Sequence, residues 1–131
     1  MLRIQSTLDE TTEARVSTII DCGITVHRTL GPGFVESVYH NALCLELESR
    51  AIPFEIERSI VVRYREKAVG IHRMDLVVYG TIVVELKAVK NLDVAHHAQI
   101  LSYLKATGCR VGLLMNFGGA TLAQGLRRVV L

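Results

Sequence analysis

The sequence contains no tryptophan, only two prolines and only three cysteines among its 131 residues. Cys22, Cys44 and Cys109 form no CxxC pair, which excludes zinc ribbons and thioredoxin-type redox motifs. Because they are odd in number and lie among apolar neighbours, we expect buried free thiols. Reduced cysteines, together with the lack of a signal-like or membrane-length apolar run, lead us to expect a cytoplasmic protein with no membrane partner.

Charge of one sign is also scarce in this chain. Fifteen basic and thirteen acidic residues leave a net charge of +2. This is far below the excess of a protein that holds nucleic acid by total charge, so only a local patch could do so. Half of the residues are hydrophobic, and a domain of this length buries roughly two-thirds of its unfolded surface. Folding therefore needs no metal, and a bound metal would serve chemistry.

The hydrophobic pattern predicts a mixed α/β domain in the order α-α-β-β-β-α-β, with a short strand at the C-terminus. We expect a tail at residues 1–10 and one domain at 11–131, with Thr11 or Thr12 capping the first helix. The expected helices are about 11–30, 35–50 and 93–107, and the expected strands are about 54–64, 69–78, 81–89 and 110–116.

Three charged residues interrupt segments that otherwise resemble the interior of a sheet. Asp75 lies within RMDLVV, and Glu85 and Lys87 lie within VVELKAV. Such side chains are almost never fully buried without partners. Glu85 and Lys87 are two residues apart, so both leave the same face of their strand.

Whether Asp75 joins them depends on the hairpin between the two strands. A three-residue loop places Asp75 and Glu85 on one face, and a two-residue loop places them on opposite faces. Gly80 can adopt the left-handed conformation that ends a three-residue loop, so the sequence permits the first register without requiring it.

If the two carboxylates share a face, they form an oxygen site suited to Mg²⁺ or Mn²⁺. The neighbouring Lys87 can then hold or activate a water and stabilise developing negative charge. A purely structural ion pair between Glu85 and Lys87 is the alternative, and an isolated ExK pattern favours it. That alternative predicts a loss of a few kcal/mol in Lys87→Ala, whereas a catalytic lysine predicts almost none.

Two helices carry further polar residues at helical spacing. Glu36 and Tyr39 share a face near the start of the second helix, and spacing alone favours a structural explanation, with the helix dipole accounting for Glu36 and an aromatic core position for Tyr39. His96, Gln99 and Tyr103 share a face of the third helix, and spacing alone favours a solvated face. The neighbouring histidines His96-His97 point about 100° apart, which does not suit a shared zinc ion.

Several of these residues fall in motifs of a known family. Gly33 to Tyr39, GFVESVY, has the pattern GxxExxY. Other matching segments are VHRTLGPG at 26–33, RMDLVV around Asp75, VVELKAV around Lys87 and HHAQILSYLKATGCRVGLLMNFG at 96–118. From about residue 11 to 131 the chain resembles the GxxExxY protein family, a branch of the PD-(D/E)XK nuclease superfamily.

The resemblance implies a restriction-endonuclease-like core and a divalent-metal site. It assigns Asp75, Glu85 and Glu36 to the Mg²⁺ or Mn²⁺ ion and Lys87 to the water. It adds Gln99 and Tyr103 of the third helix as catalytic residues, as in exonuclease-like members, while His97 stands where the family more often has an acidic residue.

The resulting hypothesis is a metal-dependent nuclease that acts on DNA in preference to RNA. The alternative is a non-catalytic subunit with the same fold that binds a protein or nucleic-acid partner. A homodimer is compatible with both hypotheses.

Overall fold

Two helices begin the part of the chain that this computed structural model describes, residues 8–131. Helix α1 (Glu10–Leu30) starts slightly earlier than predicted, because Asp9 and not Thr11 or Thr12 is its N-cap. The Asp9 carboxylate accepts a hydrogen bond from the amide of Thr12 at 2.6 Å. Most of the predicted tail, residues 1–7, lies outside the described residues.

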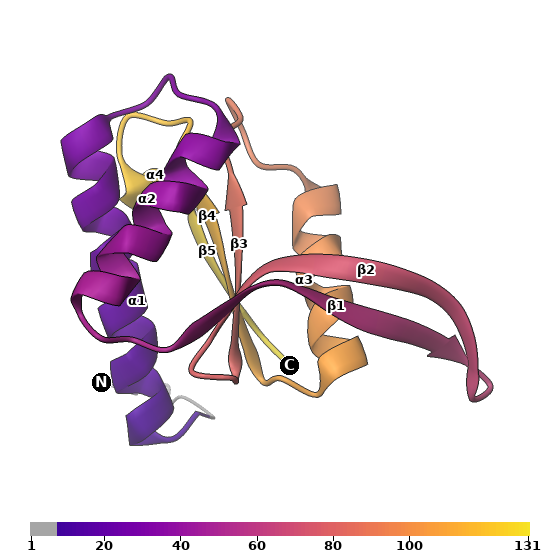
Figure 1. The fold of residues 1–131 in the computed structure, drawn as a ribbon. Helices are drawn as coiled ribbons and strands as arrows, with labels where there is room; N and C mark the ends of the chain where they lie inside the picture. Colours follow the sequence, from indigo (N-terminus) through magenta and orange to yellow (C-terminus); the bar gives the residue numbers. More distant parts are fainter. Residues whose placement is uncertain (1–7) are drawn as a thin grey trace, which may run out of the picture.

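Helix α2 (Glu36–Ser49) follows a tight loop at Gly31-Pro32-Gly33. Gly31 and Gly33 have φ angles of 70° and 112°, a backbone region that favours glycine. The loop reverses the chain, so that α1 and α2 lie side by side over one face of the sheet (Figure 1).

The described residues form one mixed sheet in the order β1-β2-β3-β4-β5. β3 and β4 are parallel and connected through helix α3 (Val94–Thr107), and the other neighbours are antiparallel. The strands are β1 (Phe54–Tyr64), β2 (Lys67–Val78), β3 (Ile82–Lys87), β4 (Val111–Asn116) and β5 (Leu126–Val130). The predicted mixed sheet and the short last strand are confirmed. The one-turn helix α4 (Leu122–Gly125) before β5 was not predicted.

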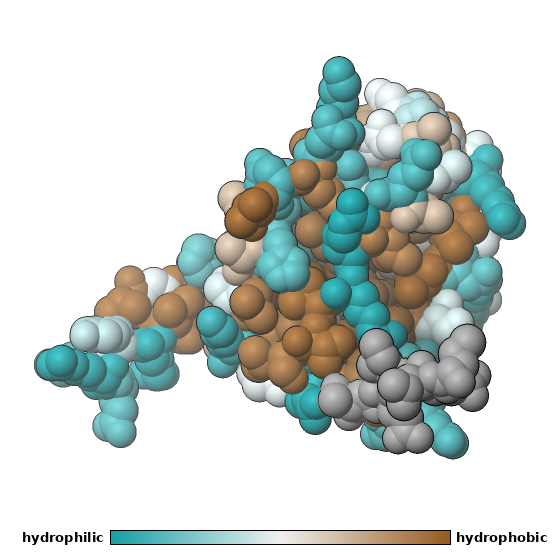
Figure 2. All heavy atoms as spheres, turned by 180° about the vertical axis from the view of Figure 1, so that it is seen from behind, coloured by the Kyte–Doolittle hydropathy of each residue, from teal (hydrophilic) through white to brown (hydrophobic). Residues whose placement is uncertain are grey.

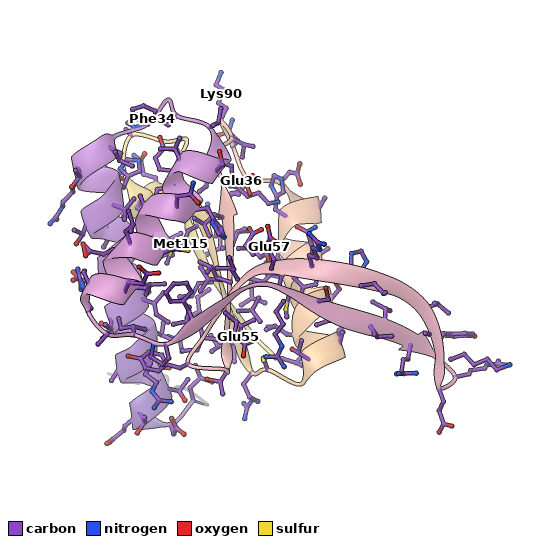
Figure 3. All side chains as sticks on the ribbon, viewed as in Figure 1. Phe34, Glu36, Glu55, Glu57, Lys90 and Met115 are labelled. Atoms are coloured by element: carbon purple, nitrogen blue, oxygen red, sulfur yellow. The ribbon has the colours of Figure 1, made fainter. Side chains whose placement is uncertain are left out.

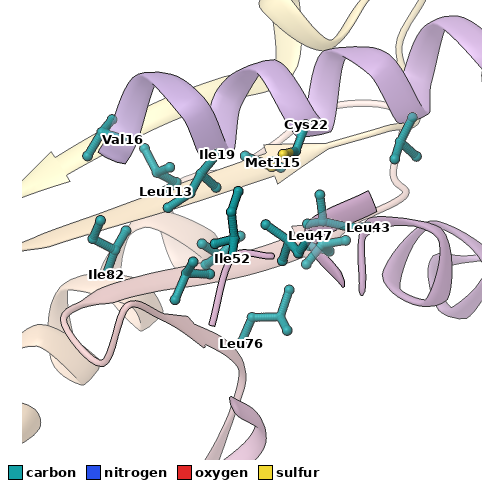
Figure 4. Packing of buried hydrophobic residues seen from close by; sticks show 14 of the residues in the cluster. Val16, Ile19, Cys22, Leu43, Leu47, Ile52, Leu76, Ile82, Leu113 and Met115 are labelled. Atoms are coloured by element: carbon teal, nitrogen blue, oxygen red, sulfur yellow. The ribbon is translucent and has the colours of Figure 1, made fainter. Parts of the chain in front are cut away.

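Hydrophobic side chains pack on both faces of this sheet. On one face, α1 and α2 cover β3 and β4 with a cluster in which Ile19, Leu43 and Leu113 are fully buried (Figure 4). On the other face, Ile100, Tyr103 and Leu104 of α3 pack against the sheet. The sheet is thus enclosed between helices, an arrangement that buries β3 and β4 on both faces.

The three cysteines are free thiols, as predicted, but only Cys22 is fully buried, whereas Cys44 and Cys109 are half-buried. Cys44 and Cys109 pack against the two core clusters without being fully buried. Within residues 8–131, the helices are all too short or too polar to cross a membrane.

The β1–β2 hairpin extends well beyond the rest of the sheet (Figure 1). β3 pairs with β2 only from Leu76 to Val78, so the outer part of the hairpin is a ribbon of two strands. Its turn consists of Arg65 and Glu66, and Lys67 already belongs to β2. β2 therefore begins two residues earlier than expected.

Candidate active site

The loop between β2 and β3 has three residues, Tyr79, Gly80 and Thr81. Val78 therefore pairs with Ile82 and Leu76 with Val84, which puts Asp75 opposite Glu85 at the next step. Tyr79 and Gly80 have φ angles of 56° and 69°. Of the two registers that the sequence permits, the structure has the one that brings both carboxylates together.

β2 and β3 separate at this point, and the two carboxylates replace the missing backbone partners. The Asp75 amide donates to Oε1 of Glu85 at 3.0 Å. The Leu86 amide donates to Oδ2 of Asp75, also at 3.0 Å. Because buried amides require acceptors, these bonds fix both carboxyl groups in the opening between the strands. Each group keeps a second oxygen that neither of these two bonds occupies.

Glu85 is the most deeply buried acid of the pair, with 3% of its surface exposed. Burial raises the pKa of Glu85 to about 8, and the negative charge of Asp75 and a side-chain hydrogen bond to it act in the same direction. The Asp75 amide and the charge of Lys87 oppose the shift in pKa. The pKa of Glu85 is thus raised because two carboxyl groups lie close together in a buried place. Such a pair is stabilised by sharing a proton or by binding a cation.

Lys87 is half-buried at the last position of β3. Among residues 8–131, no carboxylate comes within 4.0 Å of its ammonium group, so the predicted structural ion pair with Glu85 is not formed. The carbonyl of Lys87 accepts from the amide of Phe117 at 2.8 Å. The backbone of Lys87 is held, while its charged end is left without an ionic partner.

Asn116, which the sequence analysis did not single out, fixes the chain just after Lys87. Its side chain accepts from the Val89 amide and donates to the Val89 carbonyl, both at 2.9 Å. It also accepts from the Gly118 amide at 3.1 Å. The signal was available, because Asn116 is a buried amide at the end of an apolar strand and such groups require partners. We class it as a positioning residue.

Glu36 is the first residue of α2, and Tyr39 fixes the loop that precedes it. The Tyr39 hydroxyl donates to the Gly31 carbonyl at 2.6 Å and accepts from the Phe34 amide at 3.1 Å. The Tyr39 ring is fully buried and stacks on Phe117 at 4.7 Å. The GxxExxY pattern therefore has a structural basis: a glycine with positive φ, an acid at the helix start and a tyrosine that holds the loop.

Glu36 also interacts electrostatically with the carboxylate pair. Burial raises the pKa of Glu36, and the negative charge of Asp75 raises it further, whereas Lys87 lowers it. Figure 3 shows Glu36 where α2 begins, close to the end of β3 in that view. Glu36 itself remains exposed. It borders the pair without touching it.

His40 is a second residue that the sequence analysis missed. Its Nε2 atom lies 3.4 Å from the carbonyl oxygen of Asp75, and its Nδ1 lies 3.9 Å from Sγ of Cys44. His40 is four residues after Glu36, so the i,i+4 spacing could have indicated that both face the site.

The two candidates on α3 differ in position. Tyr103 is buried, and burial raises its pKa, with the charges of Glu85 and Asp75 acting in the same direction. Gln99 is exposed, and within the described chain no hydrogen bond joins its side chain to the carboxylates. His96 caps α3 together with Asp93, as part of a capping box. Tyr103 is thus buried within electrostatic reach of the two carboxyl groups, whereas Gln99 is exposed and makes no hydrogen bond to them among residues 8–131.

A metal ion fits this donor set in part. Asp75 and Glu85 offer hard oxygen ligands at one point, where a cation offsets their mutual repulsion. However, no three His, Cys, Asp or Glu side chains between residues 8 and 131 gather closely enough to form a ready-made metal cluster. Glu36 does not complete the set in this conformation.

A mixed sheet between helices that presents two carboxylates and a lysine from adjacent strands is a nuclease-type architecture. The chain belongs to the PD-(D/E)XK nuclease superfamily, whose family model matches residues 13–129. No curated protein matches the sequence. Among solved structures, the crystal structure of SSO0001 is similar, with a TM-score of 0.53 and 21% identity. The alignment covers 72% of this chain and 48% of SSO0001, so it supports the fold alone.

Proposed function

We propose that this protein is a metal-dependent nuclease that hydrolyses phosphodiester bonds, in DNA in preference to RNA. The observation that supports the proposal best is the opposition of Asp75 and Glu85 where β2 and β3 separate, with Lys87 two residues further along β3. Two carboxylates in a largely apolar sheet, with a lysine at the end of β3 that has no ionic partner among residues 8–131, are typical of a functional site.

In this proposal, Asp75 and Glu85 bind Mg²⁺ or Mn²⁺ through the oxygens that their amide bonds leave open. A divalent cation supplies Lewis-acid stabilisation of charge on a phosphoryl group. Glu36, whose pKa is raised by the negative charge of Asp75 after the larger effect of burial, would be the third candidate ligand.

Lys87 directs its ammonium group toward the attacked phosphate, where it holds a water and offsets the developing negative charge. Tyr103, whose pKa is raised by burial and by the charges of Glu85 and Asp75, orients the substrate through its hydroxyl. Gln99, which is exposed one helical turn before Tyr103 on α3, is the candidate for contact with the substrate. The free cysteines fit the cytoplasmic location that we propose from the sequence.

The test is Mg²⁺- or Mn²⁺-dependent cleavage of DNA and RNA by the purified chain. We expect Asp75→Asn and Lys87→Ala each to reduce cleavage at least about 100-fold. Asparagine keeps an oxygen that can accept from the Leu86 amide, so Asp75→Asn should fold. Glu48→Gln and Lys105→Ala, which change exposed residues of α2 and α3, are the matched controls and should cleave normally.

Two outcomes would decide against the proposal. A well-folded protein that cleaves neither DNA nor RNA with either metal would favour a non-catalytic subunit, in which Asp75→Asn leaves partner binding intact. A loss of several kcal/mol in Lys87→Ala, measured by unfolding in EDTA, would favour a structural role for Lys87. The narrower assignment to the GxxExxY branch rests on the Gly33–Tyr39 motif and is part of the proposal.

A further inference from the structure

The outer part of the β1–β2 hairpin, residues 58–73, is here called the arm. Beyond Asp75 its two strands have no third strand beside them, because β3 pairs with β2 only as far as Leu76. Figure 2 shows the arm projecting from the body, with hydrophilic side chains at its tip and hydrophobic ones closer to the body. Asp75 lies two residues beyond Arg73, so the arm leads directly into the candidate active site.

The arm differs in charge from the rest of the chain. It contains five of the fifteen basic residues and only one of the thirteen acidic residues, which gives the arm a net charge of +4. The remainder of the chain then has a net charge of −2. The basic residues are Arg58, Arg63, Arg65, Lys67 and Arg73. The small net charge of the whole protein therefore conceals a local positive patch.

The cations at the tip lack acidic partners within the described chain. Near the body, Arg58 and Arg73 lie 3.7 and 3.8 Å from glutamates in exposed pairs, which contribute little. Arg63, Arg65 and Lys67 have no carboxylate within 4.0 Å among residues 8–131. Three such charges, close together and exposed, repel one another, which an external polyanion would relieve.

The turn at the tip indicates that Arg65 is present for a purpose other than folding. Arg65 and Glu66 have φ angles of 50° and 66°, the left-handed conformation at both positions of a two-residue hairpin turn. Asn-Gly is the favoured sequence for this turn, and a residue such as arginine there costs of order 1 kcal/mol. Folding alone would favour a different residue at the position that carries the outermost positive charge.

We propose that the arm grips duplex DNA by lying in the major groove, with Arg63, Arg65 and Lys67 on the phosphates. This inference rests on the proposed nuclease function and names its substrate as B-form duplex. Each strand of the arm has seven residues beyond the turn, or about 20 Å of ribbon. A two-stranded ribbon fits the B-form major groove, which is about 12 Å wide, whereas the major groove of A-form RNA is too narrow.

The same ribbon explains why apolar side chains are exposed on the arm. Val61 and Ile71 are paired across the two strands, and both are exposed, Ile71 to 70%. In a groove, such side chains can contact thymine methyl groups while the cations contact phosphates. Because the arm continues into Asp75, this placement brings the sugar–phosphate backbone to the carboxylate pair.

The first experiment measures binding of the full chain to a labelled DNA duplex in EDTA over a range of salt concentrations. We expect the triple variant Arg63→Ala/Arg65→Ala/Lys67→Ala to bind at least about tenfold more weakly. The salt slope, which is the steepness with which the logarithm of the binding constant falls with the logarithm of the salt concentration, should decrease by about 3. The triple variant Arg28→Ala/Lys105→Ala/Arg127→Ala removes the same charge from exposed positions off the arm. It should retain the wild-type slope and most of the affinity.

The second experiment separates DNA contact from folding. Arg65→Gly and Glu66→Gly both place glycine where φ is already positive, so both should keep the hairpin. Arg65→Gly should weaken binding several-fold and lower the salt slope by about 1, whereas Glu66→Gly should bind as tightly as wild type or more tightly.

Several results would overturn the role of the arm. One is a wild-type protein that does not bind duplex DNA. Another is an equal loss of affinity in the arm and control triple variants. The third is a duplex RNA of the same sequence that binds as tightly as the DNA. A shift from dimer to monomer in the arm variant, with DNA affinity unchanged, would identify the arm as a protein contact instead. Cleavage is measured separately from binding. If binding depends on the arm but no cleavage occurs, only the proposed nuclease function is refuted. If the arm variants cleave DNA as well as the wild type does, only the proposed role of the arm is refuted.

Discussion

From Leu76 to Val78, strand β2 lies between two neighbouring strands and its side chains are fully buried. From Lys67 to Arg73, the same strand has one neighbour and every side chain is exposed. The inner half provides a rigid apolar frame, and the outer half provides charge and reach. Asp75 lies at the boundary, where β2 and β3 separate. There the backbone amides of Asp75 and Leu86 donate to side-chain carboxylates. The inner half of β2 therefore contributes to the stability of the fold, whereas the outer half is exposed and available to a partner.

Two substitutions three residues apart on β2 test the difference between its inner and outer halves. Met74 is 0% exposed and belongs to the cluster under α3, whereas Ile71 is 70% exposed. We expect Met74→Ala to lower the free energy of unfolding by about 2–5 kcal/mol, and Ile71→Ala to change it by less than about 0.5 kcal/mol. Denaturant unfolding of both variants measures the difference. Similar losses would mean that Ile71 packs against the body, as Ile60 at the base of the arm does.

A second prediction concerns the pH dependence of stability at the boundary. The pKa of Glu85 is about 8 in the folded chain, above its ordinary value of 4.5, so between these values the folded state binds more protons than the unfolded state. This group therefore stabilises the metal-free protein most below about pH 4.5, and its contribution is lost as the pH rises through 8. We expect a loss of about 2–4 kcal/mol across this range relative to Glu85→Gln.

Glu85→Gln is the matched variant because its side chain can still accept from the Asp75 amide. Unfolding of both proteins in EDTA from pH 5 to pH 9 gives the difference. Mn²⁺ at pH 8.5 should raise the melting temperature of the wild type more than that of Glu85→Gln, because the cation offsets two crowded charges in one and a single charge in the other. Parallel pH curves would mean that folding does not raise the pKa of Glu85.

The fold was predictable because its helices and strands have clear periodicity, and the predicted order was right to within a few residues at most ends. The register of the β2–β3 hairpin was not, because Gly80 permits two loop lengths and Tyr79 gives no sign that it adopts a positive φ. Gln99 illustrates another limit. Helical spacing shows that Gln99 and Tyr103 share a side of α3, but it does not show that Tyr103 is buried against the sheet while Gln99 is exposed.

The arm was hidden for a similar reason. The alternating pattern predicted both strands, but their excess length over β3 matters only once the sheet order is known. Asn116 and His40 were missed because their partners, Val89 and Asp75, are backbone groups of distant segments. Sequence spacing predicts neighbours on one element, whereas these contacts join different elements.

The smallest predicted effect tests whether the frame of the site is as rigid as its hydrogen bonds suggest. Tyr39→Phe removes the hydroxyl that joins the Gly31 carbonyl to the Phe34 amide, and it leaves the stacking on Phe117 in place. We expect a loss of about 1 kcal/mol in the free energy of unfolding. Because the loop positions Glu36, the variant should bind Mg²⁺ more weakly, and cleavage at a fixed Mg²⁺ concentration should fall several-fold. Binding of duplex DNA by the arm should stay unchanged. Tyr64→Phe, which alters an exposed tyrosine on the arm, is the control and should leave both stability and metal dependence unchanged. If Tyr39→Phe instead weakens duplex binding, the start of α2 and the arm are coupled. The separation between the site and the DNA-binding arm would then not hold for the start of α2.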